Sequence, residues 1–315
     1  MAARISRQTV DSSTSPLVCT APHYAAVAAR WRGPVVYYVT DLIVAYGERP
    51  QRIRALDRRM CQVATLVCPN SKRVADYLMN EAGCAPGKIQ IVPNATRAIN
   101  IFAHPVSKPT SPPKDIADLP RPLAGVIGNM AANINWELLQ DVVAQTPWLS
   151  WVFVGPTEMP VPEPKQFEAR ERLIQHKGRV RFVGNKPYGE LRDYARSLDV
   201  AILPYRKQEP TFSGSSTRFY EHLATCRPMI STRGFEELLH KEPLLQLADD
   251  PQEMVAKIEQ LRAVDFSDGY EQMRWHASQD GTWERRAATM REALSERLRS
   301  GAVRNNDEIT RAHVA

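Results

Sequence analysis

The chain has 315 residues, of which 43% are hydrophobic and 24% charged, so it can build two domains with cores of ordinary composition. No apolar run approaches the roughly 20 residues that cross a bilayer, which excludes a membrane-spanning protein. The first residues lack the apolar core of a signal peptide, and we expect a cytoplasmic protein.

The formal net charge of +6 is unevenly distributed. Residues 1–114 contain 15 Lys and Arg against 6 Asp and Glu, whereas the rest contains 26 against 29. A basic first part favours an anionic partner, and both phospholipid and nucleic acid have that charge. A basic face that only contacts water is the alternative.

The five cysteines are scattered, form no CxxC pair and are odd in number. This pattern is typical of reduced, buried thiols in a cytoplasmic protein and predicts no metal site.

The clearest break in the chain is the segment from His104 to Pro122, where six of nineteen residues are proline. Such a segment is typical of a stiff linker. We therefore predict a first domain over 1–104, a linker over 105–119, a second domain over 120–285, and a C-terminal helix and tail over 286–315.

Short β-rich runs alternate with helical patterns in both domains. In the first domain, strands are expected over 16–21, 34–40, 65–71 and 88–94, and helices over 55–64 and 71–83. In the second, strands are expected over 123–129, 149–156, 179–185, 199–205 and 227–232, and helices over 133–147, 168–178, 188–198 and 216–226. This alternation predicts an α/β fold with parallel sheets covered by helices on both faces. A long charged helix is expected over 283–300.

The strand-to-helix turns of the second domain are where a ligand is expected, because open α/β sheets bind ligands beyond the carboxyl ends of their strands. No turn carries GxGxxG or a Walker motif, so neither dinucleotide nor P-loop chemistry is supported. The strongest candidate is a small polar run before the helix at 216–226. Its members are Ser213, Gly214, Ser215, Ser216 and Thr217. Backbone N–H groups there can bind an anion, or a serine can simply cap the helix.

Arg218 lies in the first turn of that helix, where the helix dipole favours an acid rather than a base. A bound anion would explain this arginine, and so would a solvent-exposed side chain. Glu221 follows one turn later, where its carboxylate faces either solvent or a cleft. A carboxylate at a cleft can accept two hydroxyl groups of a ribose.

Several phrases of the sequence resemble those of a large family. They are "RVRFVGNKPYGELRDYARSLDVAILPY", "STRFYEHLATCRPMIST" and "CPNSKRVADYLMNEAGCAPGKIQIVPNATR". In order and spacing they are similar to the retaining, sugar-nucleotide-dependent glycosyltransferases of family 4, or group 1. The resemblance covers about residues 16–295 and implies the GT-B architecture of two Rossmann-like domains, of which the first is shortened here.

The resemblance implies a role for each turn of the second domain. Glu221 would hold the ribose hydroxyls, the run from Ser213 to Thr217 would cradle the diphosphate, and Arg218 would pair with phosphate. The remaining donor-site residues would be Gly128, Asn129, Gly184, Asn185 and Tyr188. No metal or other cofactor is implied, since side chains and helix dipoles can stabilise the leaving diphosphate.

The sequence also departs from the family pattern. Ser213 stands where many members carry a glutamate, and Arg227 stands where they carry a glycine. In the first domain, Asp41 and the weaker candidate His23 are the only catalytic side chains we can name, and each has a structural explanation as well.

Two functions therefore remain open. The first is an enzyme that transfers a sugar from a nucleotide sugar to a hydroxyl group of a saccharide or lipid-linked acceptor, in cell-surface or exopolysaccharide biosynthesis. It would be peripheral at the inner face of the membrane. The second is a catalytically impaired, nucleotide-binding or regulatory subunit. No nucleic-acid partner is expected, because the basic part lacks a known reading motif.

Overall fold

A computed structural model describes residues 15–47, 49–176 and 178–301. The N-terminal residues 1–14 and the tail expected beyond 301 lie outside the described residues. The chain divides into two compact units. The first contains residues 1–94, 213–215 and 285–315, and the second contains 95–212 and 216–284. Three residues of the serine-rich run thus belong to the first unit.

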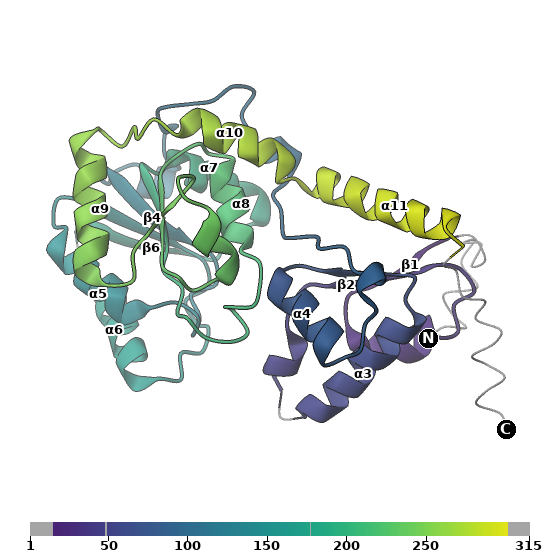
Figure 1. The fold of residues 1–315 in the computed structure, drawn as a ribbon. Helices are drawn as coiled ribbons and strands as arrows, with labels where there is room; N and C mark the ends of the chain where they lie inside the picture. Colours follow the sequence, from purple (N-terminus) through teal and green to yellow (C-terminus); the bar gives the residue numbers. More distant parts are fainter. Residues whose placement is uncertain (1–14, 48, 177, 302–315) are drawn as a thin grey trace. The chain divides into compact units, whose positions relative to one another are not determined.

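The first unit contains a parallel sheet of three strands in the order β1-β2-β3 (Figure 1). The strands are β1 (Leu17–Cys19), β2 (Val35–Val39) and β3 (Leu66–Pro69). Its helices are η1 (Pro22–Tyr24), α2 (Ala25–Ala28), α3 (Pro50–Val63) and α4 (Lys72–Asn80), followed much later by α11 (Trp283–Arg299). The short 3-10 helices of this region are η2 (Ile43–Ala45) and η3 (Pro86–Lys88).

Side chains alternate along β2 and so bury both faces of this sheet. Val35 and Tyr37 pack in a core with α2, α3 and α4, whereas Val36 packs on the opposite face. There it packs with Met290 and Leu294, two apolar residues of α11. The sheet is therefore covered on both faces although it has only three strands.

The strand expected over 88–94 is absent from the structure, and this prediction is wrong. The segment makes a single bridge to β3, between Ile89 and Val67. The N–H of Gln90 donates to the carbonyl of Val67 at 2.9 Å. In a parallel ladder, the carbonyl of Gln90 would next accept a hydrogen bond from the N–H of residue 69. Residue 69 is proline, which has no N–H, and so the ladder cannot continue.

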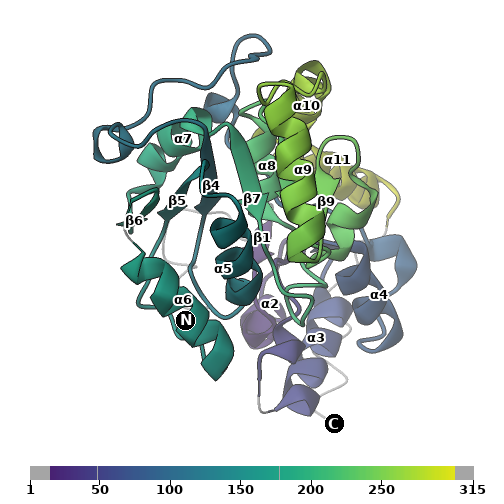
Figure 2. The ribbon, with the colours of Figure 1, turned by 90° about the vertical axis from the view of Figure 1, so that its left-hand side faces the viewer.

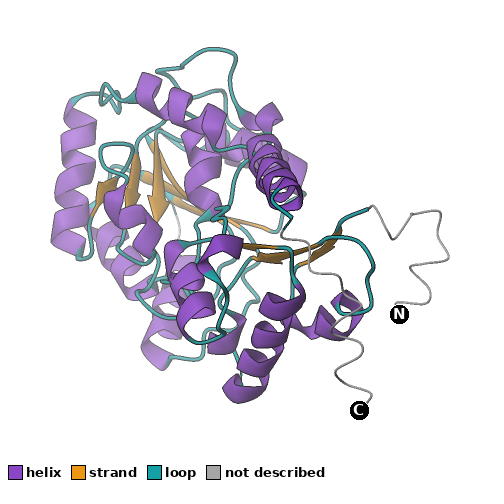
Figure 3. Cartoon of the chain, turned by 45° about the vertical axis from the view of Figure 1, so that its right-hand side comes forward, coloured by secondary structure: helices purple, strands orange, loops and turns teal. Residues whose placement is uncertain are grey.

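The second unit contains a parallel sheet of six strands in the order β6-β5-β4-β7-β8-β9, of which Figure 2 labels all but β8. Figure 3 shows strands in orange among helices in purple. The strands are β4 (Leu123–Ile127), β5 (Ser150–Val154), β6 (Val180–Gly184), β7 (Val200–Leu203), β8 (Met229–Ser231) and β9 (Gln246–Leu247). The helices are α5 (Trp136–Gln145), α6 (Pro164–Gln175), α7 (Tyr188–Ser197), α8 (Thr217–Leu223), α9 (Pro251–Ala263) and α10 (Glu271–Asp280). Short 3-10 helices are η4 (Ala98–Asn100), η5 (Lys114–Ile116) and η6 (Glu236–His240).

Two cores cover the two faces of the six-stranded sheet. One contains buried residues of α5, α6 and α9, and the other contains buried residues of α7 and α8. The expected α/β fold with two Rossmann-like parallel sheets is confirmed, with a smaller first sheet. The elements β9, α9 and α10 were not expected from the sequence.

The proline-rich segment 105–119 packs on the second unit. Ile116 is completely buried in the core beside α7 and α8. The N–H of Thr110 donates to the carbonyl of Arg196 at 2.9 Å. The buried guanidinium of Arg227 donates to the carbonyls of Ser107 and Phe266, so this arginine ties the segment to the loop after α9.

Among the described residues, no helix is both long and apolar enough to cross a membrane. The five cysteines are all buried and free.

Candidate donor site in the second unit

The centre of the second sheet is where ligands bind in folds of this kind. β4 and β7 are neighbours, yet α5 after β4 and α8 after β7 pack on opposite faces. The strand order therefore reverses between β4 and β7, and a crevice forms outside their carboxyl ends. Gly128 follows β4 directly, and α8 carries Arg218 and Glu221.

The turn after β4 has room only for glycine. Gly128 has φ of +142°, and a Cβ atom on it would lie 2.8 Å from Nε of Arg218. Gly155, with φ of +150°, lies even closer to its neighbour, since its Cβ would lie 1.7 Å from the carbonyl oxygen of Gly128. These glycines bring the turns after β4 and β5 together and place the first turn against Arg218.

Ser216 caps the N-terminus of α8, since its hydroxyl accepts a hydrogen bond from the N–H of Phe219 at 3.3 Å. Phe219 and Leu223 are buried in the core, which directs Arg218 and Glu221 away from it. Arg218 donates to the carboxylate of Glu221 in an i,i+3 ion pair. The anion beside Arg218 is therefore, in this structure, the glutamate one turn later.

Tyr188, the first residue of α7, completes this cluster. Burial raises the pKa of its phenol to about 12, and the charge of Glu221 and a hydrogen bond to it act in the same direction. Burial alone would lower the pKa of Arg218, but the charge of Glu221, a hydrogen bond to it and the nearby Tyr205 and Tyr188 together raise the pKa. Glu221 therefore stands between a cation and a phenol, as a carboxylate whose oxygens can accept hydrogen bonds.

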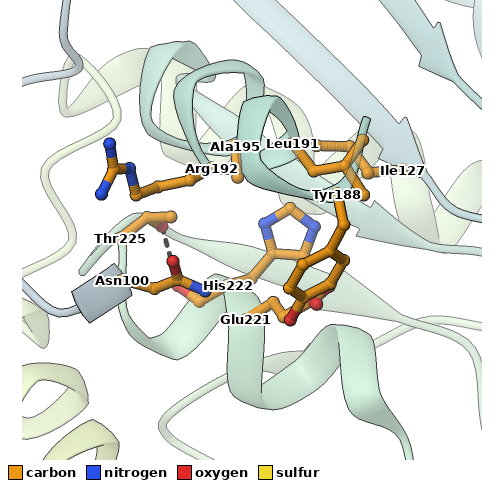
Figure 4. A pocket seen from close by; sticks show the side chains of 9 residues that line it. All are labelled: Asn100, Ile127, Tyr188, Leu191, Arg192, Ala195, Glu221, His222 and Thr225. Carbon is orange, nitrogen blue, oxygen red and sulfur yellow. Dashed lines mark hydrogen bonds between the residues drawn. The ribbon is translucent and has the colours of Figure 1, made fainter. Parts of the chain in front are cut away.

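A pocket opens between α7 and α8 beside this cluster (Figure 4). Its lining combines polar and apolar side chains: Asn100, Ile127, Tyr188, Leu191, Arg192, Ala195, Glu221, His222 and Thr225. The ring of His222 lies at the centre of this group in Figure 4. Burial, followed by the charge of Arg218, lowers the pKa of His222 to about 3, so its imidazole is neutral at neutral pH.

The serine-rich run lies before α8, and its polar groups are engaged within the protein. Ser213 accepts a hydrogen bond from Nε of Arg73 at 3.2 Å, and its carbonyl accepts one from the hydroxyl of Ser71. The hydroxyl of Ser215 accepts one from the N–H of Asn94 at 2.9 Å. Gly214, between the two serines, is buried.

The last N–H before α8 also has a partner that the sequence did not indicate. The N–H of Ser216 donates to Oε2 of Glu237 at 3.0 Å, and Tyr220 donates to the other oxygen of that carboxylate. Glu237 thus occupies the position beside Ser216 that a bound anion was expected to take. Thr217 begins α8 and is half-buried.

The other expected donor-site residues lie in turns that follow neighbouring strands. Gly184 ends β6 with φ of +76°, and its carbonyl accepts from the N–H of Gly155 at 2.9 Å. Asn185 after it and Asn129 beside Gly128 are both exposed. The structure therefore groups Gly128, Arg218, Glu221 and Tyr188 by contacts or charge.

The two candidate side chains of the first unit lie on different elements. His23 belongs to η1 and is exposed. Asp41 follows β2, and burial of its carboxyl group raises its pKa while a hydrogen bond to Tyr46 opposes the change. A more deeply buried acid, Asp57 of α3, was not singled out from the sequence. It accepts from Tyr37 at 2.6 Å and from Tyr77 at 2.7 Å.

Comparisons with known proteins agree with this geometry. Residues 121–263 match the family described as glycosyl transferases group 1. No curated protein sequence matches the chain significantly. Among solved structures, HepE from Anabaena in complex with UDP and glucose is similar, with a TM-score of 0.69 and 17% identity over 93% of this chain and 80% of that one.

Two further structures have similar folds. Sucrose-phosphate synthase from Thermosynechococcus elongatus gives a TM-score of 0.66 and 19% identity over 91% of this chain and 74% of that one. A glycosyltransferase from Rickettsia africae gives a TM-score of 0.70 and 12% identity over 94% and 79%. At these identities the likeness concerns the fold.

Proposed function

We propose that this chain is a sugar-nucleotide-dependent glycosyltransferase, and we propose which residues hold the donor and which acceptor receives the sugar. Residues 121–263 match the group 1 glycosyl transferases, and the solved structure of HepE is similar in fold. The donor is a nucleoside diphosphate sugar, and the acceptor is a hydroxyl group of a saccharide or lipid-linked acceptor in cell-surface or exopolysaccharide synthesis. The observation that carries the donor assignment is the cluster of Arg218, Glu221 and Tyr188 beside Gly128.

When the donor binds, the ion pair of Arg218 and Glu221 separates, and each side chain contacts a different part of the ligand. Glu221 accepts hydrogen bonds from the ribose hydroxyls, and Arg218 turns to the diphosphate, whose charge replaces that of the carboxylate. Gly128 leaves the space that this movement needs, because any side chain there would meet Arg218. Arg218 then stabilises the negative charge that develops on the leaving diphosphate.

The rest of the donor site is proposed from the turns around this cluster. Gly184, Asn185 and Tyr188 frame the base, and Asn129 approaches the donor from the turn after β4. The hydroxyls and N–H groups of Ser213 to Thr217 contact the diphosphate, which requires an exchange of the partners that several of them have. Asp41 and His23 are proposed for the acceptor side.

Titration with UDP and GDP tests the donor assignment. A nucleotide at 100 times its dissociation constant adds about 2.7 kcal/mol to the free energy of unfolding. We expect Glu221→Gln to lose this stabilisation. Glu168→Gln is the matched control, because Glu168 forms an exposed pair with Arg172 on α6. Equal stabilisation of wild type and Glu221→Gln would remove Glu221 from the donor site.

The second candidate function is a binding or regulatory subunit without turnover. Ser213 favours it, because a hydroxyl stands where many members carry a glutamate, and this hydroxyl accepts a hydrogen bond from Arg73. Nucleotide binding without hydrolysis or transfer from UDP- and GDP-sugars would identify this function. Measured transfer would exclude it.

A face of the first unit supports a peripheral position at an anionic membrane. The side chain of Tyr46 is 65% exposed, and α3 after it carries the exposed basic residues Arg52, Arg58 and Arg59. An exposed aromatic ring and several exposed basic residues that follow it in the chain suit a membrane surface, where each basic residue contributes about 1 kcal/mol.

Flotation with liposomes tests this contact. We expect the wild type to float with vesicles that contain anionic lipid and to remain below with zwitterionic vesicles. Arg52→Glu with Arg59→Glu should abolish flotation, while Lys72→Glu on α4 should not. Equal flotation with anionic and with zwitterionic vesicles would contradict the proposal.

A further inference from the structure

The pocket between α7 and α8 contains a polar atom that the donor assignment above does not use. His222 is 2% exposed, and among the described residues its Nδ1 atom has no hydrogen-bond partner. Buried polar atoms nearly always have a partner, because an unsatisfied one lowers stability. Nδ1 of His222 therefore indicates a group that binds in the pocket.

The imidazole of His222 is held in a fixed place. It follows Glu221 directly on α8, and Phe219 and Leu223 on the same helix are buried in the core. The hydroxyl of Thr225 donates to the carbonyl of His222 at 2.7 Å and closes the end of the helix (Figure 4). The ring therefore has little freedom to find a partner elsewhere in the protein.

The volume and lining of the pocket and the neutral charge of the imidazole limit which ligand groups can hydrogen-bond to Nδ1. The free volume of the pocket is about 20 Å³, which is enough for one oxygen atom with its hydrogens. Ile127, Leu191 and Ala195 supply apolar walls, and a phosphate group with its several oxygen atoms exceeds this volume. A neutral imidazole can exchange a hydrogen bond with a hydroxyl group.

We propose that His222 is a specificity-determining residue that hydrogen-bonds one ribose hydroxyl of the donor nucleotide through Nδ1, beside the carboxylate of Glu221. The inference rests on the proposed donor site, since Glu221 and Tyr188 line the same pocket. Two adjacent residues of one helix then hold the sugar of the nucleoside. An analogue without that hydroxyl leaves Nδ1 buried and unpaired, which is how a polar site rejects a ligand that lacks the matching group.

Calorimetric titration with UDP, 2′-deoxy-UDP and 3′-deoxy-UDP tests the proposal on the full chain. We expect wild type to bind UDP about ten-fold more tightly than one of the two deoxy analogues. His222→Leu, which keeps the volume but removes the nitrogen, should reduce this preference to the part that Glu221 supplies. The affinity for the analogue itself should not change.

Two amide variants separate the nitrogen from the volume of the ring. His222→Asn places a polar atom near the position of Nδ1 and should keep the full preference for UDP, whereas His222→Gln places it near Nε2 and should reduce the preference as His222→Leu does. This pair keeps the test valid if His222→Leu does not fold. Full preference in both His222→Leu and His222→Gln would show that Nδ1 does not select the ribose hydroxyl, and would overturn the inference.

The failure of this inference differs from the failure of the donor assignment. Suppose that UDP binds and that Glu221→Gln weakens its binding, but that the His222 variants leave the preference for UDP over the deoxy analogue unchanged. In that case only the inference fails. If wild type binds neither UDP nor GDP, the donor assignment fails and the inference fails with it.

Discussion

Gly128 lies directly against the guanidinium of Arg218, at a distance that leaves no space for a methyl group. Gly128→Ala would therefore displace Arg218, and it would also strain a backbone with φ of +142°. We expect the affinity for UDP to fall about ten-fold or more, a loss of about 1.4 kcal/mol.

Gly189→Ala is the control for this change. Gly189 lies in α7 with nothing within 4 Å of its Cβ position. Alanine is favoured over glycine in a helix, so the free energy of unfolding should rise by about 0.5–1 kcal/mol without loss of UDP affinity. Unchanged UDP binding in Gly128→Ala would contradict the position we assign to Arg218.

Arg218→Met should affect nucleotides according to their charge. If Arg218 turns to the diphosphate, its loss should weaken UDP by about ten-fold to a hundred-fold and leave uridine almost unchanged. Titration of UDP and uridine at two salt concentrations measures the difference. An equal loss for both ligands would mean that Arg218 acts only by holding Glu221.

Stability at acid pH should depend on His222. The pKa of an unfolded histidine is about 6.5, whereas that of His222 in the fold is about 3. Between these values the unfolded chain binds a proton that the fold does not. The contribution of the neutral His222 to the free energy of unfolding is therefore fully present above pH 6.5. It falls by about 1.4 kcal/mol per pH unit as the pH decreases towards 3.

Urea unfolding at pH 7 and pH 5 measures this dependence. We expect wild type to lose about 2 kcal/mol more than His222→Leu over that range. Equal losses would show that the imidazole can reach water or a carboxylate in the fold.

The buried carboxylate of Asp57 should stabilise the first unit. It accepts from the hydroxyls of Tyr37 and Tyr77, and Tyr37 is completely buried. Asp57→Ala leaves both hydroxyls without this acceptor, and we expect a loss of about 3 kcal/mol in the free energy of unfolding. Asp76→Asn, which breaks an exposed pair with Lys72, should change it by less than about 0.5 kcal/mol.

Much of the fold could be predicted from local patterns. The strands expected over 123–129, 149–156 and 199–205 contain the buried strands β4, β5 and β7. The helix expected over 71–83 contains α4, which Ser71 caps by accepting from the N–H of Val74. α9 was missed although it has a clear start signal. Asp250 accepts from the N–H of Glu253, and Pro251 occupies the first helical position.

The contacts of the candidate site could be predicted only where they are local. Arg218 and Glu221 are three residues apart on one helix, a spacing that allows an ion pair. Glu237 is 21 residues from Ser216, and nothing in the sequence indicates that its carboxylate meets that N–H. The burial of His222 likewise depends on how α7 and α8 pack, which periodicity does not give.

The attachment of the proline-rich segment has a practical consequence for dividing this protein. From its composition alone, one would start a fragment of the second domain at about residue 120 and would expect proteases to cut the segment easily. A chain that began there would lack Ile116 from the core, and the buried Arg227 would lose the carbonyl of Ser107. We expect such a fragment to be poorly soluble, and we expect a fragment that begins near Ala95, where the second unit begins, to fold.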